Sequence, residues 1–435
     1  MRREMRRGRG LRHCSCLLQA SVALSWAALA SLLVPVASLA AADLAAISAA
    51  ARLYKAGKYA ECIELTAPLE LQSKQSEAAF LLNIRANMAL GQHALALNTL
   101  VEAIKVYPAS IRLRWIGRDV LRYNNRAADA TYLLDQMGTL LKRFRWRYND
   151  AVNYIVLGQF ELLLGADPGQ VLKNRFNPAK QAAADSTASY LAIGQLALDK
   201  HDFEMAAQQF QAAAKIDPSD PDIYFGIAQA FEPSDSKKST AAIEAALKRN
   251  PNHVDSLLFM VDQHIDAERY EDAADAVDQV LKFNPREPRG WAYRAVLAHL
   301  ANQADEEQRC RQQGLATWPA NPEVDYLIGR ELSQKYRFRE GASYQEQSLR
   351  LDPGYLLAKS QLAQDRLRLG QEQQGWKLAR EVYDSDGYNI YAHNLVTLED
   401  HISEFHTLRS QGFILRMDAR EAILFGQRAL EPTFR

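Results

Sequence analysis

The sequence predicts an all-α fold, a solenoid of helix-turn-helix repeats that ends in a short helix-strand-helix segment. Two observations predict the repeats: helix-breaking prolines recur at a nearly constant spacing, and each interval between them carries the apolar pattern of a helix pair. A third observation predicts the end of the chain. In GFILRMD, residues 412–418, apolar and polar residues alternate with period two, as they do in a half-buried strand.

The N-terminus has the composition of an export signal. A basic segment, MRREMRRGRGLRHCSC, precedes an apolar one, and small residues follow at Ala40 to Ala42. We expect residues 1–42 to be a cleaved signal peptide and the protein to be periplasmic or secreted. The alternative is an inner-membrane anchor, because residues 17–37 form an apolar run long enough to span a bilayer. Membrane contact is expected only in that second case.

The charge balance of the expected mature chain argues against broad classes of polyanionic partner. The 435 residues hold 52 basic and 52 acidic side chains, and the expected signal removes six arginines and one glutamate. The remaining 46 basic and 51 acidic residues make the mature chain mildly acidic. We therefore expect no nucleic-acid partner. Cys62 and Cys310 fall in different predicted repeats and are expected to be packing cysteines without a disulfide.

The proline ladder locates the repeats. Its members are Pro218, Pro251, Pro285, Pro319 and Pro353. They recur with a period of about 34 residues, a length typical of helix-pair arrays, and the next step reaches Gly387, another helix breaker. Proline ends a helix because it lacks the amide proton and clashes with the preceding turn. The ladder therefore predicts helix pairs of constant length.

One unit shows the pattern within a period. In SYLAIGQLALDKHDFEMAAQQFQAAAKIDP, Leu191, Gly194 and Ala197 share one face of a first helix. A short turn at residues 200–202 leads into a second amphipathic helix. Gly194 and Ala206 are predicted where the two helices cross, because larger side chains would hold the helices apart.

These features resemble the tetratricopeptide repeat, a helix pair of fixed length with small residues at fixed positions and a closing proline. Gly57 and Gly91 continue the resemblance near the N-terminus, one such period apart. We expect N-terminal repeats at 43–144, a degenerate repeat or insertion at 145–186 and the main array at 187–387. The resemblance implies a right-handed superhelix whose concave groove holds an extended peptide or a partner helix, with no chemistry of its own.

The same resemblance supplies candidate binding residues. Position 9 of each first helix faces the concave side in this repeat. Reading that column unit by unit gives the polar candidates Gln195, Gln229, Asp262, Arg330 and Gln364. Glutamine and arginine can hydrogen-bond an extended backbone, and the alternative is a solvated inner face without a ligand.

Signatures of catalysis and metal binding do not appear. The sequence holds no Gly-rich phosphate loop, no GxSxG and no HExxH. His401 and His406 are five residues apart, whereas a helical metal pair needs a spacing of about four. We predict no catalytic residue, no metal, no cofactor and no small-molecule substrate.

The C-terminal segment departs from the repeats. We expect a terminal helix at 388–411 and an α/β stub at 412–435, with one strand that has no neighbour in this chain. YAHNL (391–395), FILRMDAREA (413–422) and Gly426 resemble the start of the gluzincin-type, peptidase MA-like domain that follows such repeats in some exported bacterial proteins. The zinc-binding HExxH that the resemblance implies would lie beyond residue 435, so it assigns no catalytic residue here.

Two functions remain open at this point. The first is a non-catalytic protein–protein interaction scaffold outside the cytoplasm, which binds an extended peptide or a partner helix in the groove. The second is the repeat half of an exported zinc metallopeptidase whose catalytic domain is missing from this chain. If the chain is complete, the final strand is expected to dock on the last repeat or to pair with a partner's sheet.

Overall fold

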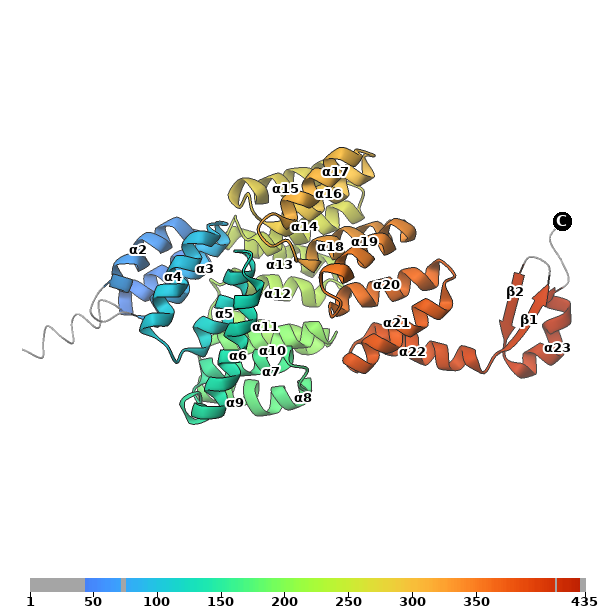
Figure 1. Ribbon diagram of the computed structural model, residues 1–435, viewed down its shortest axis with the longest axis horizontal. Coiled ribbons are helices and arrows are strands. Elements are labelled where there is room, and N and C mark those ends of the chain that lie inside the picture. The colour runs from blue at the N-terminus through green and yellow to red at the C-terminus, as the bar shows by residue number, and fades with distance from the viewer. Residues whose placement is uncertain (1–43, 72–75, 411–412, 431–435) are drawn as a thin grey trace, which may run out of the picture.

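The chain folds as an all-α superhelical solenoid of helix-turn-helix repeats, which confirms the predicted fold class (Figure 1). The computed structural model describes residues 44–71, 76–410 and 413–430, and the predicted signal peptide lies outside them. Among the helices of these ranges, none is both long and apolar enough to cross a membrane.

The N-terminal part consists of three helix pairs. Residues 44–55 are helical and share a small core with the next helix through Ala50, Tyr59 and Cys62. The helices that follow are α2 (Tyr59–Leu71), α3 (Glu77–Ala89), α4 (His93–Val106), α5 (Ile111–Arg122) and α6 (Ala127–Phe144). The apolar faces of α3 to α6, including Leu100 and Leu113, form one continuous core.

The fourth pair is irregular. Helix α7 is regular, but its partner is broken into a four-residue helix, a π-helical turn and a six-residue helix. The elements are η1 (Arg145–Arg147), α7 (Ala151–Leu163), α8 (Pro168–Val171), η2 (Leu172–Phe176) and α9 (Asn177–Ala182). The core remains filled at this break, because Phe176 is buried against Gly158. A Cβ atom added at Gly158 would lie 2.3 Å from the Phe176 ring.

The main array consists of regular helix pairs, and the ladder prolines lie between successive pairs. Its helices are α10 (Thr187–Asp199), α11 (Phe203–Ile216), α12 (Pro221–Phe231), α13 (Ser236–Arg249), α14 (Val254–Asp266), α15 (Tyr270–Phe283), α16 (Pro288–Leu300), α17 (Ala304–Leu315), α18 (Pro322–Gln334), α19 (Phe338–Leu351), α20 (Leu356–Arg368) and α21 (Glu372–Ser385). Every ladder proline lies in the junction between two pairs, as the sequence predicts.

In most pairs the turn between the two helices is closed by a residue in the left-handed backbone region. Gly57 and Gly91 have φ of 74° and 68° there. The amide of Lys58 returns to the carbonyl of Leu53 at 2.9 Å, which is the hydrogen bond of a helix that ends in this conformation. Other pairs use residues with side chains at the same place, namely Asn125, His201, Glu268, Asn302 and Tyr336.

Small residues lie where helices cross, as predicted. Phe210 of α11 is 2% exposed and packs between two first helices. A Cβ atom at Gly194 of α10 would lie 2.7 Å from its ring, and one at Gly226 of α12 only 2.4 Å from it. Ala206 is fully buried at the same crossing. The spacing of the pairs is thus set by one large side chain between two glycines.

The C-terminal segment corrects two predictions. The terminal helix α22 (Ile390–Ser403) ends earlier than the predicted 388–411. Residues His406–Ser410 form strand β1, which pairs antiparallel with β2 (Phe413–Met417), so the GFILRMD strand is confirmed but is not alone. Helix α23 (Ala419–Leu430) packs on the hairpin, and Leu408 lies against Gly426. In Figure 1 this hairpin and helix project from the end of the solenoid.

Candidate functional site

The solenoid winds back on itself, so that early turns dock on late junctions. The turn at Gly57 meets Asn250, and the turn at Gly91 meets Asn284, so the two contacts span equal lengths of chain. In the third pair, the ring of Tyr123 lies 5.9 Å from the ring of Trp318. Each of the three later residues directly precedes a ladder proline. We call these contacts the inter-turn contacts.

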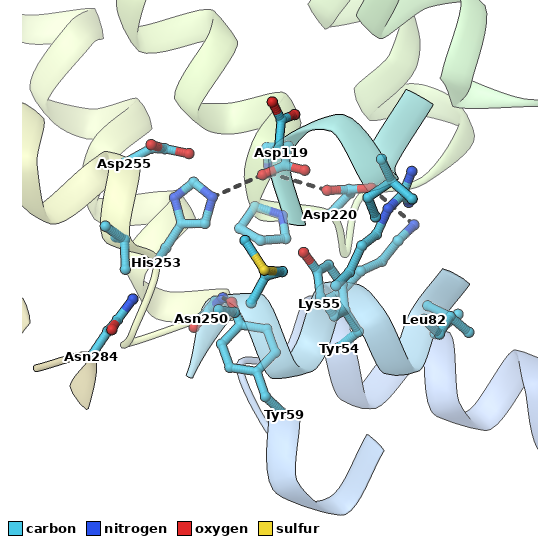
Figure 2. A pocket seen from close by; sticks show the side chains of 18 of the residues that line it. Tyr54, Lys55, Tyr59, Leu82, Asp119, Asp220, Asn250, His253, Asp255 and Asn284 are labelled. Atoms are coloured by element: carbon cyan, nitrogen blue, oxygen red, sulfur yellow. Dashed lines mark hydrogen bonds and ion pairs between the residues drawn. The ribbon is translucent and has the colours of Figure 1, made fainter. Parts of the chain in front are cut away.

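A cavity of about 600 Å³ lies between the two turns of the solenoid. One wall, the N-terminal wall, comes from residues 44–144. The other wall comes from the first turns of α10, α12, α14 and α16. Figure 2 shows Tyr54, Lys55 and Tyr59 of the first wall opposite Asp220, Asn250 and His253 of the second. We call this space the inter-turn cavity.

The second wall is built from helix N-termini, because the first helices of successive pairs begin side by side. Asp220 caps α12, His253 caps α14 and Glu287 caps α16, each by accepting a backbone N–H of its helix. Capping satisfies the free amides of these helices, and it also places an acidic or imidazole side chain at each step along the cavity.

Ion pairs cross the cavity and line it. Lys55 reaches from the N-terminal wall to Asp217 at 2.5 Å and to Asp220 at 2.9 Å. On the opposite wall, Arg289 lies between Asp255 at 2.6 Å and Glu287 at 2.9 Å. Each of these cations is therefore held by two carboxylates.

His253 forms a hydrogen-bonded chain with two neighbours. Its Nε2 lies 2.8 Å from Asp222 Oδ1, and its Nδ1 lies 2.7 Å from Ser256 Oγ. Burial alone would lower the pKa of His253, but the hydrogen bond and charge of Asp222 outweigh it, and the pKa is raised. The order of groups is that of a Ser–His–Asp relay. Ser256 is fully buried, however, so its hydroxyl cannot contact a substrate. These three hydrogen-bonded side chains instead have the geometry of a helix cap.

The N-terminal wall supplies aromatic rings and a buried histidine. The hydroxyl of Tyr59 accepts from Asn250 Nδ2 at 3.1 Å, and burial raises the pKa of Tyr59 to about 12. His93 is 3% exposed, and its Nδ1 has no hydrogen-bond partner among the described residues. Burial, together with the charge of Arg286, lowers the pKa of His93 to about 4. The ring is therefore neutral near pH 7, and its Nδ1 is buried in the cavity wall.

Arg85 is the one cation of the cavity lining for which the described residues provide no ion-pair partner. It is exposed on α3. Five carboxylates and three cations line the cavity among the described residues. The acidic members are Asp119, Asp220, Asp222, Asp255 and Glu287, and the basic members are Lys55, Arg85 and Arg289. The lining thus combines both charge signs with tyrosine rings, a composition that suits a polar segment of a partner.

The five sequence-predicted residues lie elsewhere, and none of them lines the cavity. Asp262 and Arg330 bind each other at 2.5 Å, and Arg330 also binds the buried Glu331. Gln195 donates to Asp199 on its own helix at 2.9 Å and is exposed. Gln229 and Gln364 are half-buried on α12 and α20. The structure therefore brings together only two of the five, as a pair.

The cysteines and histidines form no metal site in the described part of the chain. No group of three or more histidine, cysteine or acidic side chains is placed to hold an ion there. Cys62 and Cys310 are buried free thiols, as expected, and burial raises their pKa values to about 11 and about 12.

Comparison with known proteins adds one sequence match. Residues 187–220, which cover α10 and α11, match the tetratricopeptide repeat family. No curated protein matches the chain in sequence.

Several solved structures match the chain at low similarity. The crystal structure of the APC/C hetero-tetramer Cut9-Hcn1 is 14% identical over 82% of this chain and 83% of that chain, with a TM-score of 0.41. Yeast Tom70 is 14% identical over 83% and 96%, with a TM-score of 0.34. The human IFIT1 dimer with m7Gppp-AAAA is 12% identical over 79% and 84%, with a TM-score of 0.43. At these scores none of them bears on the partner of this chain. The chain is an all-α solenoid of tetratricopeptide-like repeats.

Proposed function

We propose that the protein is a non-catalytic scaffold that binds an extended segment of a partner protein in the inter-turn cavity of its groove. Solenoids of stacked helix pairs expose long concave surfaces and act through them as interaction scaffolds. The observation that carries the proposal is the cavity itself, about 600 Å³ in volume and lined by charges of both signs and by tyrosines. Such a lining suits a peptide, which brings amides and charged side chains together.

The unpaired charge of Arg85 favours a polar ligand over an apolar one. Arg85 is exposed, and it has no ion-pair partner among the described residues. Arg85 supplies a matching contact for a carboxylate or a backbone carbonyl.

The proposal is tested by capture from cells that make the protein. The purified native protein and the Arg85→Glu variant are each incubated with cell extract, and bound proteins are identified and quantified by mass spectrometry. We expect a partner whose recovery falls at least several-fold with Arg85→Glu. The control is Arg339→Glu, which reverses an exposed arginine on α19 away from the cavity. Equal recovery by both variants and the native protein contradicts a role for the cavity.

The proposed place of action is outside the cytoplasm, as a periplasmic or secreted protein. The support is the order of basic, apolar and small-residue segments in residues 1–42. Sequencing the N-terminus of the protein isolated from its host tests this directly. A mature chain that begins at or near Asp43 supports export with cleavage, and a chain that retains the apolar segment contradicts cleavage.

A further inference from the structure

The N-terminal wall is held against the rest of the solenoid by the inter-turn contacts, which repeat in register. The turns at Gly57 and Gly91 are one repeat period apart, and so are the Asn250 and Asn284 junctions that receive them. Trp318, one further period along the chain, receives Tyr123 and the guanidinium of Arg122, 5.2 Å from the ring. The glycine–asparagine contacts therefore repeat one relation at two steps, and ring contacts to Trp318 follow at the third.

The fit at the two asparagines leaves no room for a side chain. A Cβ atom at Gly57 would lie 2.1 Å from Asn250 Oδ1, and one at Gly91 would lie 2.2 Å from Asn284 Oδ1. Both asparagines are buried, at 1% and 3% exposure, although they lie in loops. Each also accepts a backbone N–H two residues on, which fixes its side chain in place.

The contacts across this boundary are few and mostly polar, unlike the cores within the wall. They comprise side-chain hydrogen bonds, the Lys55 ion pairs and single ring contacts such as Tyr59 with Phe283, whose ring centroids are 5.6 Å apart. Within the wall, α3 to α6 instead share a continuous apolar core. Segments joined by few apolar contacts open at lower free energy than a packed core does.

The wall also connects to the main array through the irregular fourth pair. There the second helix is broken at α8, η2 and α9 into pieces of four, five and six residues. Pro168 and Pro178 lie in this segment. π-Helical turns and short helices of this kind often mark hinges.

We propose that the inter-turn contacts are a releasable clasp that holds the superhelix closed over the inter-turn cavity, and that residues 164–186 are the hinge about which the N-terminal wall opens. Only the purpose of the clasp, which is to admit a partner and close on it, rests on the proposed function. A ligand that touches both walls binds the closed form better and shifts the population toward it. The clasp itself is a property of the free protein.

The test uses hydrogen exchange on the unliganded full chain and a matched pair of glycine variants. Gly57→Ala and Gly370→Ala both place a side chain at φ 74°, but Gly370 has nothing within 4 Å of the added Cβ atom. The backbone strain is therefore common to both, and only Gly57→Ala meets Asn250. The reporter is the amide of Arg286, which donates to Asn284 Oδ1 at the second inter-turn contact.

We expect the exchange of the Arg286 amide to rise about tenfold in Gly57→Ala and to stay unchanged in Gly370→Ala. The amide of Ala130, inside the wall, and that of Gly341, in the distant pair, keep their rates if the wall opens as a unit. Equal Arg286 rates in the two variants overturn the proposal, because the turns would then dock independently. A parallel rise at Ala130 also overturns it, because the wall would then unfold rather than open. A parallel rise at Gly341 overturns it too, because the variant would then loosen the solenoid far from the clasp.

A second variant tests the clasp from its other end. Trp318→Ala removes the third contact without adding a clash. It should raise exchange at the amide of Arg286 and at that of Asn252, which donates to Asn250 Oδ1 at the first contact. The control is Trp146→Ala, since Trp146 is 73% exposed and remote from the junctions. Unchanged exchange at both reporters in Trp318→Ala contradicts the clasp. Neither experiment involves a partner, so a failed clasp and a failed partner site are distinguishable.

Discussion

The guanidinium Nη2 of Arg330 lies 2.5 Å from the Oδ1 of Asp262, although 68 residues separate them in the chain. Asp262 is on α14 and Arg330 on α18, and Tyr293 of the intervening α16 joins both through its hydroxyl. The inner faces of three successive first helices therefore converge. Two members of the predicted polar column therefore bind each other here.

The two members of this pair should differ in their effect on stability. Arg330 also binds Glu331, which is fully buried and whose pKa burial raises well above its usual value, so Arg330→Ala removes the cation of Asp262 and the hydrogen-bond donor of Glu331. We expect a loss of about 3 kcal/mol in the free energy of unfolding. Asp262→Asn leaves the Arg330–Glu331 pair intact and should cost only about 1 kcal/mol. Denaturant unfolding of both variants checks this, and equal losses contradict the assignment.

His93 should make stability depend on pH. The pKa of His93 is lowered to about 4 in the fold, so the folded state favours the neutral ring. Its contribution is fully present above about pH 6.5 and is lost as the pH falls toward 4, by up to about 3 kcal/mol. The difference in unfolding free energy between the native protein and His93→Gln should follow this curve. The control is His406→Gln at an exposed position, which should not produce this curve. A difference in unfolding free energy that does not vary with pH for His93→Gln refutes the prediction.

Asp365 should have the opposite pH dependence. It is fully buried on α20, and burial raises its pKa to about 6 despite hydrogen bonds from Gln361 and Ser333. A carboxyl with a raised pKa favours the protonated form, so stability falls as the pH rises through about 6. We expect Asp365→Asn to be more stable than the native protein by about 2 kcal/mol at pH 8, with no advantage near pH 4. Exposed Asp185→Asn is the control and should change little at either pH.

Replacing two glycines by alanine should have opposite effects on stability, because only one of them lies at the helix crossing around Phe210. Gly226→Ala would place a Cβ atom 2.4 Å from the Phe210 ring and should destabilise the fold by about 2 kcal/mol. Gly138 lies within α6 with nothing within 4 Å of an added Cβ, so Gly138→Ala should stabilise it by about 0.5–1 kcal/mol. Thermal unfolding of both variants tests the contrast. Phe210→Leu in the Gly226→Ala background should recover part of the loss, since it opens space at the crossing.

Much of the architecture could be predicted because it is local. The prolines end helices wherever they occur, and the small residues at Gly194 and Ala206 follow from the contact between consecutive helices. Strand β2 was predicted from its period of two, but β1 was not. HTLRS, residues 406–410, has no marked alternation of apolar residues and follows an amphipathic helix, so the sequence predicts a continuation of that helix.

The candidate site could not be predicted because its walls are far apart in the chain. The resemblance predicts that position 9 of each first helix faces inward, but the sequence does not say how tightly the solenoid winds. Tight winding pairs Arg330 with Asp262 and brings Gly57 to Asn250, although several repeats lie between them. The one available signal was that Gly57 and Gly91 repeat with the same spacing as Asn250 and Asn284. A spacing shared by two distant pairs is what stacked turns of a solenoid produce.

The central claim is that a partner binds in the inter-turn cavity, and photo-crosslinking in cells that make the protein tests it most directly. A photoreactive amino acid is placed at Leu191, which lines the cavity, at Gln364 on the predicted column, or at Tyr336, which is 83% exposed. The account predicts a discrete crosslinked adduct, identifiable by mass spectrometry, from Leu191 and none from Gln364 or Tyr336. An adduct that forms from Gln364 or Tyr336 but not from Leu191 contradicts the account and places the partner elsewhere on the solenoid.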